Sequence, residues 1–159
     1  VWLVVSPHNP LKDKSSLLSD HHRLQLVCAA IGDYRKLKAS NIEFSLPKPS
    51  YTVHTLTYLF AQHPEHTFAL ILGADNLETF KKWKNWEQIL EAVELYVYQR
   101  RDSDGGELLH HPKVKVVDAP MMELSATFIR KAIHEGKDVR YMLPAAVWEY
   151  MREMHFYEK

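Results

Sequence analysis

The chain has 159 residues, a length that suits one domain, over residues 1–159, with a sizeable core. Its 20 Lys and Arg residues balance its 20 Asp and Glu residues, so no basic field indicates a nucleic-acid partner. The longest strongly apolar run, Phe68–Leu72, is too short to cross a membrane, and no signal peptide is visible. The single cysteine, Cys28, excludes an internal disulfide, so we expect a cytoplasmic protein with this residue in its core.

The first half of the chain alternates between strand and helix patterns. The elements that we predict there are a strand at 1–5, a helix from Ser19 to Gly32, an extended piece at 42–44, a helix from Ser50 to Pro64 and a strand at 67–72. In the first helix, the apolar face consists of Leu24, Val27, Cys28 and Ile31. In the second helix, the inward residues are Val53, Leu56, Leu59 and Phe60.

The second half continues the alternation. The elements that we predict there are a helical region at 77–92, a strand at 93–98, a surface loop at 102–111, a strand at 113–117, and helices at 125–134 and 144–154. This order indicates an α/β fold, with a Rossmann-like, doubly wound parallel sheet. Ligands of such sheets lie beyond the carboxyl ends of the strands. The segments 7–12, 73–75 and 125–130, together with Arg100, each follow a strand, so we expect them on one edge of the sheet.

Leu124–Arg130 opens the helix that follows the last strand. Ser125 or Thr127 can cap this helix, whose first backbone N–H groups form a ready anion site. Arg130 adds a fork of donors that suits phosphate oxygens. The pattern predicts a polyphosphate-binding segment, and the alternative is an ordinary helix cap beside a surface arginine.

Gly73 and Asp75 end a buried strand. The glycine would let a ligand approach the backbone, and Asp75 can accept from ribose hydroxyls or cap the next helix. Trp83 lies between two lysines, where it either stacks on a flat ring or joins the core.

Two further segments could bind anionic groups. Ser50-Tyr51-Thr52 opens a helix whose hydroxyls and N–H groups could hold a small carboxylate or simply cap the helix. Lys12 lies in a proline-rich loop and could pair with phosphate. No histidine, cysteine or acidic spacing predicts a metal site, and no Walker A or Gly-rich dinucleotide motif is present.

Taken together, these segments resemble the bacterial nicotinate-nucleotide adenylyltransferases of the nucleotidyltransferase superfamily, from Val1 to about Phe156. The matching segments, in the order and spacing of the family, are Pro7–Lys12, Pro49–Thr55, Leu72–Leu77 followed by Trp83, and Leu124–Arg130. The resemblance implies an enzyme of NAD biosynthesis. Such an enzyme transfers an adenylyl group from ATP to nicotinate mononucleotide, releases pyrophosphate and requires Mg²⁺.

The resemblance also implies roles for eight residues. The ATP side would consist of Ser125, Thr127 and Arg130. The side that binds the nucleotide substrate would consist of Lys12, Thr52, Gly73, Asp75 and Trp83. Arg130 would support catalysis, whereas no other catalytic residue is assigned.

Three departures from the family pattern stand out. Ala126 replaces a second serine, and His54 replaces an aspartate. The paired histidines of the superfamily's H-x-G-H motif are absent, so we expect that a first strand and helix of about 30 residues precede this chain. Without them, we expect little or no transferase activity.

Other functions stay open at this point. A related adenylyltransferase could act on nicotinamide mononucleotide or phosphopantetheine, and a non-catalytic domain could merely bind nucleotides. No membrane or nucleic-acid partner is expected, and a homo-oligomer is one expected assembly.

Overall fold

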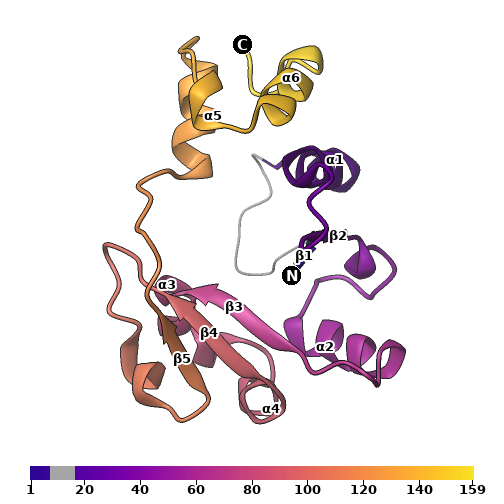
Figure 1. The fold of residues 1–159 in the computed structure, drawn as a ribbon, viewed down its shortest axis with the longest axis vertical. Coiled ribbons are helices and arrows are strands. Elements are labelled where there is room, and N and C mark those ends of the chain that lie inside the picture. Colours follow the sequence, from indigo (N-terminus) through magenta and orange to yellow (C-terminus); the bar gives the residue numbers. More distant parts are fainter. Residues whose placement is uncertain (8–16) are drawn as a thin grey trace. The chain divides into compact units, whose positions relative to one another are not determined.

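The computed structural model describes residues 1–7 and 17–159. These residues form two compact units: unit 1 contains Val1–Pro47 and Glu123–Lys159, and unit 2 contains Lys48–Met122 (Figure 1). The organisation of the chain as one domain stays a prediction. Within the described ranges, no helix has the length and apolar character that a membrane crossing requires.

Unit 1 begins with two short parallel strands, β1 (Trp2–Val4) and β2 (Lys38–Ser40). The N–H of Val5 extends the pairing by donating to the carbonyl of Ser40 at 2.9 Å. The predicted strand at 1–5 is therefore confirmed. The predicted extended piece at 42–44 is wrong, because η1 (Ile42–Phe44) is a 3₁₀ turn in which Glu43 is buried.

Helix α1 (Asp20–Ile31) joins these strands, with Ser19 as its N-cap and Gly32 at its end, as predicted. The predicted apolar face is wrong in part, since Cys28 is exposed and no residue of α1 is fully buried. The helix instead packs through Leu26 and Ala29. His22 lies on the same stripe, where its ring contacts Phe156 at a centroid distance of 4.8 Å.

Three helical elements complete unit 1: α5 (Ala126–His134), the 3₁₀ turn η4 (Arg140–Met142) and α6 (Ala145–Glu153). Their buried cluster contains Ile129, Ala132, Ile133, Val139, Val147, Met151 and Phe156. Gly136 follows the C-cap of α5, and its positive φ of 72° lets its N–H and that of Lys137 bond back to α5 carbonyls. The carboxyl end of α5 is therefore stabilised locally.

Unit 2 contains a parallel sheet of β3 (Ala69–Gly73), β4 (Glu94–Tyr98) and β5 (Val114–Val117), in that order. The register pairs Gly73 with Tyr98 and Tyr98 with Val117, so the carboxyl ends of the three strands lie side by side (Figure 1). The parallel α/β prediction is confirmed.

Helices connect and cover this sheet: α2 (Thr52–Gln62), α3 (Ala74–Glu78), η2 (Phe80–Lys82), α4 (Trp86–Ala92) and η3 (Gly106–His110). The helical region predicted at 77–92 is thus three short pieces. Phe80, Leu77, Ile89 and Leu95 are almost fully buried beneath them. Alternate residues of the strands point away from this core, so Ile71 and Tyr96 are exposed.

Candidate functional site

The carboxyl edge of the sheet in unit 2 places an acidic and a basic side chain together. Asp75 lies in the first turn of α3, directly after β3, and Arg100 follows β4. Arg100 Nε lies 3.6 Å from Asp75 Oδ1, and both side chains are about half exposed. Because Asp75 makes no cap at α3, the interpretation of this residue as a helix cap is wrong.

Gly73 makes this arrangement possible. A Cβ atom at position 73 would lie 2.3 Å from Asp75 Oδ1 and 3.3 Å from Arg100 Nε. A larger residue would therefore displace the carboxylate from the strand end. The sequence predicted that a ligand approaches the backbone closely at Gly73. In the structure, the side chain of Asp75 occupies this space.

The start of α2 forms a second polar region within unit 2. Thr52 is the first residue of the helix, and Tyr51 holds the cap position without a capping side chain. Lys84 Nζ lies 4.6 Å from the centre of the Tyr51 ring and 3.4 Å from His54 Nε2. No described carboxylate lies within ion-pair distance of Lys84, so its charge faces a phenol ring and an imidazole beside a helix N-terminus.

Trp83 lies next to Lys84 and is partly buried. Its ring packs on the core through Phe80, at a centroid distance of 5.0 Å. The two interpretations of Trp83 are therefore not exclusive, since one part of the ring joins the core and another is accessible. Its role in stacking on a ligand stays a prediction.

Ser50 does not cap α2, in contrast to the sequence prediction. The helix starts one residue later than expected, which moves Ser50 outside the cap position. Its Oγ atom is buried without a hydrogen-bond partner in the described part of the chain.

The first turn of α5 is capped as the sequence predicts, and its role in phosphate binding stays a prediction. Ser125 is the N-cap, and its hydroxyl accepts from the N–H of Phe128 at 3.1 Å. Arg130 Nη2 donates to Thr127 Oγ1 at 3.2 Å, which places both side chains on one side of the turn. No described residue accepts from the N–H groups of Ala126 and Thr127, so the anion site of this helix is open.

Arg130 keeps its positive charge uncompensated among the described side chains. Its guanidinium lies 5.9 Å from the centre of the Tyr157 ring. Burial raises the pKa of Tyr157, so this phenol stays neutral at physiological pH and does not offset the charge. Arg130 is thus a partly buried cation beside open backbone donors.

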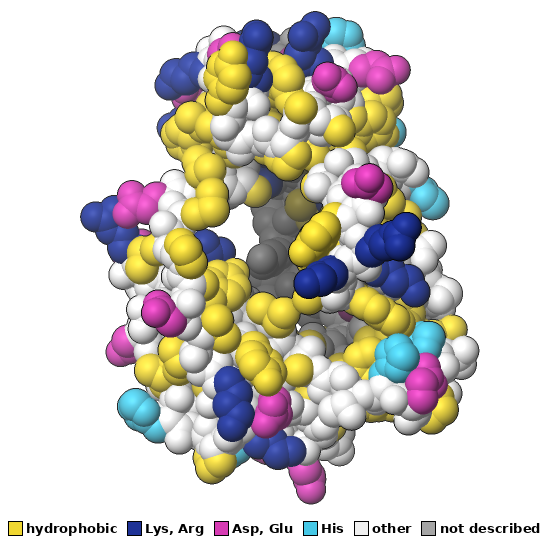
Figure 2. Space-filling model, in the orientation of Figure 1, with side chains coloured by type: hydrophobic (Ala, Val, Ile, Leu, Met, Phe, Trp, Pro, Cys, Tyr) yellow, Lys and Arg dark blue, Asp and Glu magenta, His cyan; other side chains and the backbone are white. Residues whose placement is uncertain are grey.

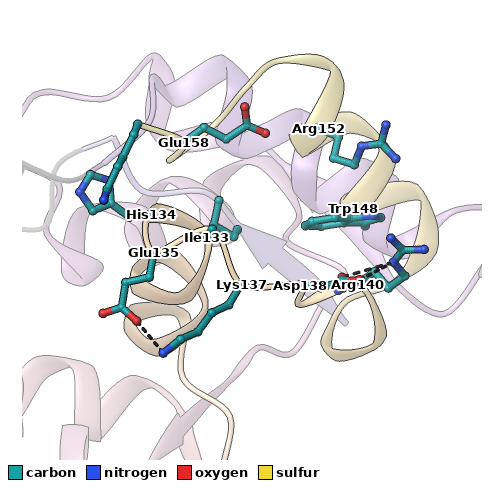
Figure 3. Close-up of a pocket in the computed structure, with 11 residues that line it drawn as sticks. Ile133, His134, Glu135, Lys137, Asp138, Arg140, Trp148, Arg152 and Glu158 are labelled. Atoms are coloured by element: carbon teal, nitrogen blue, oxygen red, sulfur yellow. Dashed lines mark hydrogen bonds and ion pairs between the residues drawn. The ribbon is translucent and has the colours of Figure 1, made fainter.

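A pocket of about 470 Å³ lies elsewhere in unit 1, beyond the other end of α5 (Figure 3). Trp148 lines it, together with two ion pairs, Arg140 with Asp138 and Lys137 with Glu135. Two of its basic side chains are therefore already paired, whereas Arg152 and Lys159 also line the pocket.

The structure thus gathers Gly73, Asp75, Thr52 and Trp83 within unit 2, and Ser125, Thr127 and Arg130 in one turn of unit 1. Lys12 lies outside the described residues. Sequence reasoning did not assign a role to Arg100 or Lys84, although both lie beside predicted site residues. Their positions next to Asp75 and Trp83 along the predicted edge are the signal that could have found them.

Comparisons with known proteins agree with this arrangement. A family model described as cytidylyltransferase-like matches residues 1–132. A protein of Flavobacterium johnsoniae, described as a probable nicotinate-nucleotide adenylyltransferase, is 53% identical over 161 residues, covering 100% of this chain and 83% of the relative. A relative of the same description from Christiangramia forsetii is 51% identical over 160 residues, with coverages of 99% and 82%.

Solved structures share the fold. Nicotinic acid mononucleotide adenylyltransferase of Plasmodium falciparum, complexed with NaAD, matches with a TM-score of 0.80 at 20% identity, covering 98% of this chain and 81% of that one. A second structure of that enzyme, complexed with APC, has a TM-score of 0.74. The predicted Rossmann-like fold is therefore confirmed. By sequence, the chain belongs to the cytidylyltransferase-like family and, within it, to the nicotinate-nucleotide adenylyltransferases.

Proposed function

We propose that this protein transfers the adenylyl group of ATP to nicotinate mononucleotide, which yields nicotinate adenine dinucleotide and pyrophosphate. Family membership supports this reaction, since relatives with about half of their residues identical carry that name. The observation that carries the proposal within the structure is the first turn of α5. There, Arg130 and Thr127 flank open backbone N–H groups.

The ATP phosphates are assigned to this turn. The Ser125 hydroxyl already satisfies one backbone donor, which leaves the N–H groups of Ala126 and Thr127 for phosphate oxygens. Replacement of the family's second serine by Ala126 does not remove these backbone donors. Arg130 would neutralise charge at the α-phosphate and at the departing pyrophosphate.

The nicotinate ring is assigned to the start of α2. Lys84 would attract the ring carboxylate, with help from the N–H groups of the uncapped helix. Because His54 stands where the family has an aspartate, Lys84 meets an imidazole here rather than a carboxylate, and its charge is available to the substrate. Trp83 would stack on the pyridine ring, and Asp75 would accept from ribose hydroxyls.

This arrangement favours nicotinate over nicotinamide. A neutral amide gains little from an uncompensated lysine, whereas a carboxylate forms a charge-assisted hydrogen bond. Phosphopantetheine has no flat ring for Trp83. The same uncompensated charges argue against a purely structural domain. Such charges contribute nothing to packing, so they would not stabilise the fold.

Mg²⁺ is part of the proposal through its association with ATP. The segment from Ser125 to Arg130 contains no carboxylate, and this ion is bound mainly through oxygen ligands. These residues therefore fit a phosphate but not a protein-held Mg²⁺ site.

The chemistry needs little from the protein beyond positioning and charge. The phosphate of the mononucleotide is already a nucleophile, and its oxygen attacks the α-phosphorus of ATP. The bond to the β-phosphate then breaks, and pyrophosphate leaves with its electron pair. Holding two anions in line and neutralising their repulsion would provide most of the acceleration.

The test offers three acceptors to the full-length protein: nicotinate mononucleotide, nicotinamide mononucleotide and phosphopantetheine, each with ATP and Mg²⁺. Chromatography follows the adenylylated product, and a coupled assay follows pyrophosphate. We expect nicotinate mononucleotide to have the highest kcat/KM. A higher value for either other acceptor, or no product from any of them, would overturn the proposal.

A further inference from the structure

Three potential metal ligands gather where α2 ends, at a place that the transferase reaction does not use. They are His63, Glu65 and His66, and their ligand atoms all lie within 4.8 Å of one another. Figure 2 shows histidine side chains beside an acidic one over this end of α2. The side chains of His66 and Glu65 are about half exposed, so solvent ions can reach them.

The spacing of the ligand atoms suits a small divalent cation. Glu65 Oε1 lies 3.1 Å from His66 Nδ1 and 3.6 Å from His63 Nδ1. In a tetrahedral zinc site with bonds of about 2.0–2.1 Å, neighbouring ligand atoms lie about 3.3 Å apart. Two of the three separations are therefore already close to those of a bound metal.

The backbone holds these side chains in place. His63 is the C-cap of α2, and its N–H bonds to the carbonyl of Leu59 at 2.9 Å. The N–H of His66 donates to the carbonyl of His63 at 3.0 Å, which closes a tight turn through Pro64. This turn stacks the two imidazole rings at a centroid distance of 5.4 Å and an interplanar angle of 22°.

Aromatic side chains of the core pack against this turn. Phe68 contacts both imidazoles, at centroid distances of 6.5 Å from His63 and 5.9 Å from His66. Phe68 itself packs on Phe60, and both belong to the apolar core of unit 2. The ligands therefore lose little freedom on binding a metal, because their positions are already restricted.

The end of a helix also favours a cation. The last carbonyl groups of α2 carry partial negative charge and lie beside the cluster. Two imidazoles and one carboxylate form a ligand set that zinc enzymes also use, with a fourth position left for water. Mg²⁺ and Ca²⁺ prefer oxygen ligands and suit this set poorly.

We propose that His63, Glu65 and His66 form a Zn²⁺-binding site at the carboxyl end of α2, separate from the transferase reaction. A metal there would tie the end of α2 to the segment that leads into β3. Its effect would be to stabilise unit 2, since a ligand that binds only the folded state raises the melting temperature.

The experiment titrates Zn²⁺ into the full-length protein by calorimetry, after removal of any affinity tag. The background variant Cys28→Ser removes the exposed thiol, which could bind zinc on its own. A pH of 8 keeps ordinary imidazoles neutral, so simple pairing of protonated histidines with Glu65 does not compete. The test variants are Glu65→Gln and His66→Ala, and the matched control is His110→Ala, outside the cluster.

We expect one Zn²⁺ to bind per chain and to raise the melting temperature, and Mg²⁺ not to displace it. Each test variant should weaken binding about tenfold or more and abolish the thermal shift, and His110→Ala should change neither. Co²⁺ should give visible absorption typical of low coordination number in the background variant and in His110→Ala, but not in the two test variants. Equal zinc affinity in the background and in both test variants would overturn the proposal, as would a lack of binding.

Discussion

Two regions of the molecule build their candidate anion sites in different ways. In the first turn of α5, a single stretch of six residues supplies the cap, a second hydroxyl and the arginine, through Ser125, Thr127 and Arg130. In unit 2, the cations come from elsewhere along the chain. Lys84 reaches the start of α2 from 30 residues away, and Arg100 reaches Asp75 from the end of another strand.

A site of the first kind is easier to predict from a sequence than one of the second kind. A site within one helical turn depends on local spacing, so its geometry follows from the helix itself. A composite site depends on strand order and register, which bring distant residues to one edge. The two sites should therefore also respond differently to substitution.

The largest effect is expected from Arg130→Ala, which removes the only cation of the α5 turn. If this arginine stabilises the transition state, kcat should fall about 100-fold to 1,000-fold, with little change in melting temperature. Steady-state assays of pyrophosphate release measure this loss. Arg130→Lys should recover only part of it, because a lysine lacks the planar fork.

Arg140→Ala serves as the control for this variant, since Arg140 lies near the other end of α5 and pairs with Asp138. It should retain normal turnover. A similar loss of turnover in both variants would show that the overall positive charge of the protein, rather than the position of Arg130 in α5, determines the rate.

The next largest effect is expected from Gly73→Ala, at the carboxyl edge of the sheet in unit 2. The new Cβ atom would displace the Asp75 carboxylate, so the KM for the mononucleotide should rise about tenfold, the value of one charge-assisted hydrogen bond. Asp75→Asn should cause a similar rise. Because both act on one carboxylate, the double variant should be no worse than either single one. Additive losses would contradict this coupling.

A smaller and more selective effect is expected from Lys84→Ala. The preference for nicotinate over nicotinamide mononucleotide should fall about tenfold, because the lost charge matters only for the carboxylate. The ratio of the two kcat/KM values measures it. Lys82→Ala, an exposed lysine two residues away, should leave this ratio unchanged.

The smallest effects concern stability. Ser125→Ala removes the N-cap of α5 and should lower the free energy of unfolding by about 1 kcal/mol in denaturant titrations. Cys28→Ser should change it by less than about 0.5 kcal/mol, since the thiol is exposed. A loss of several kcal/mol for Cys28→Ser would restore the buried role that the sequence predicted.

The fold was largely predictable because its strongest signals are local. The apolar strands, the caps Ser19 and Ser125, and the stop at Gly32 all lie where the sequence predicts them, although one face of the sheet in unit 2 is exposed. The apolar face of α1 was misassigned for a physical reason. The stripe that packs contains His22, whose ring contacts Phe156 and so serves as part of the core.

Other errors have similar causes. Ile42–Phe44 alternates apolar and polar residues like a strand, but three residues also complete a 3₁₀ turn, and the N–H of Phe44 bonds back to Asn41. Ser50 has the right chemistry for a cap, yet α2 starts one residue later. Residue type alone does not determine these two features. The backbone conformation of the preceding residues sets where each helical turn begins.

The most direct test of two separate anion sites measures equilibrium binding of ATP and nicotinate mononucleotide to Arg130→Ala and Lys84→Ala in the full-length protein. We expect Arg130→Ala to weaken binding of ATP and to retain binding of the mononucleotide. We expect the reverse for Lys84→Ala. Equal weakening of both ligands by either variant, or no weakening of either ligand, would contradict the assignment of ATP to α5 and of nicotinate to α2.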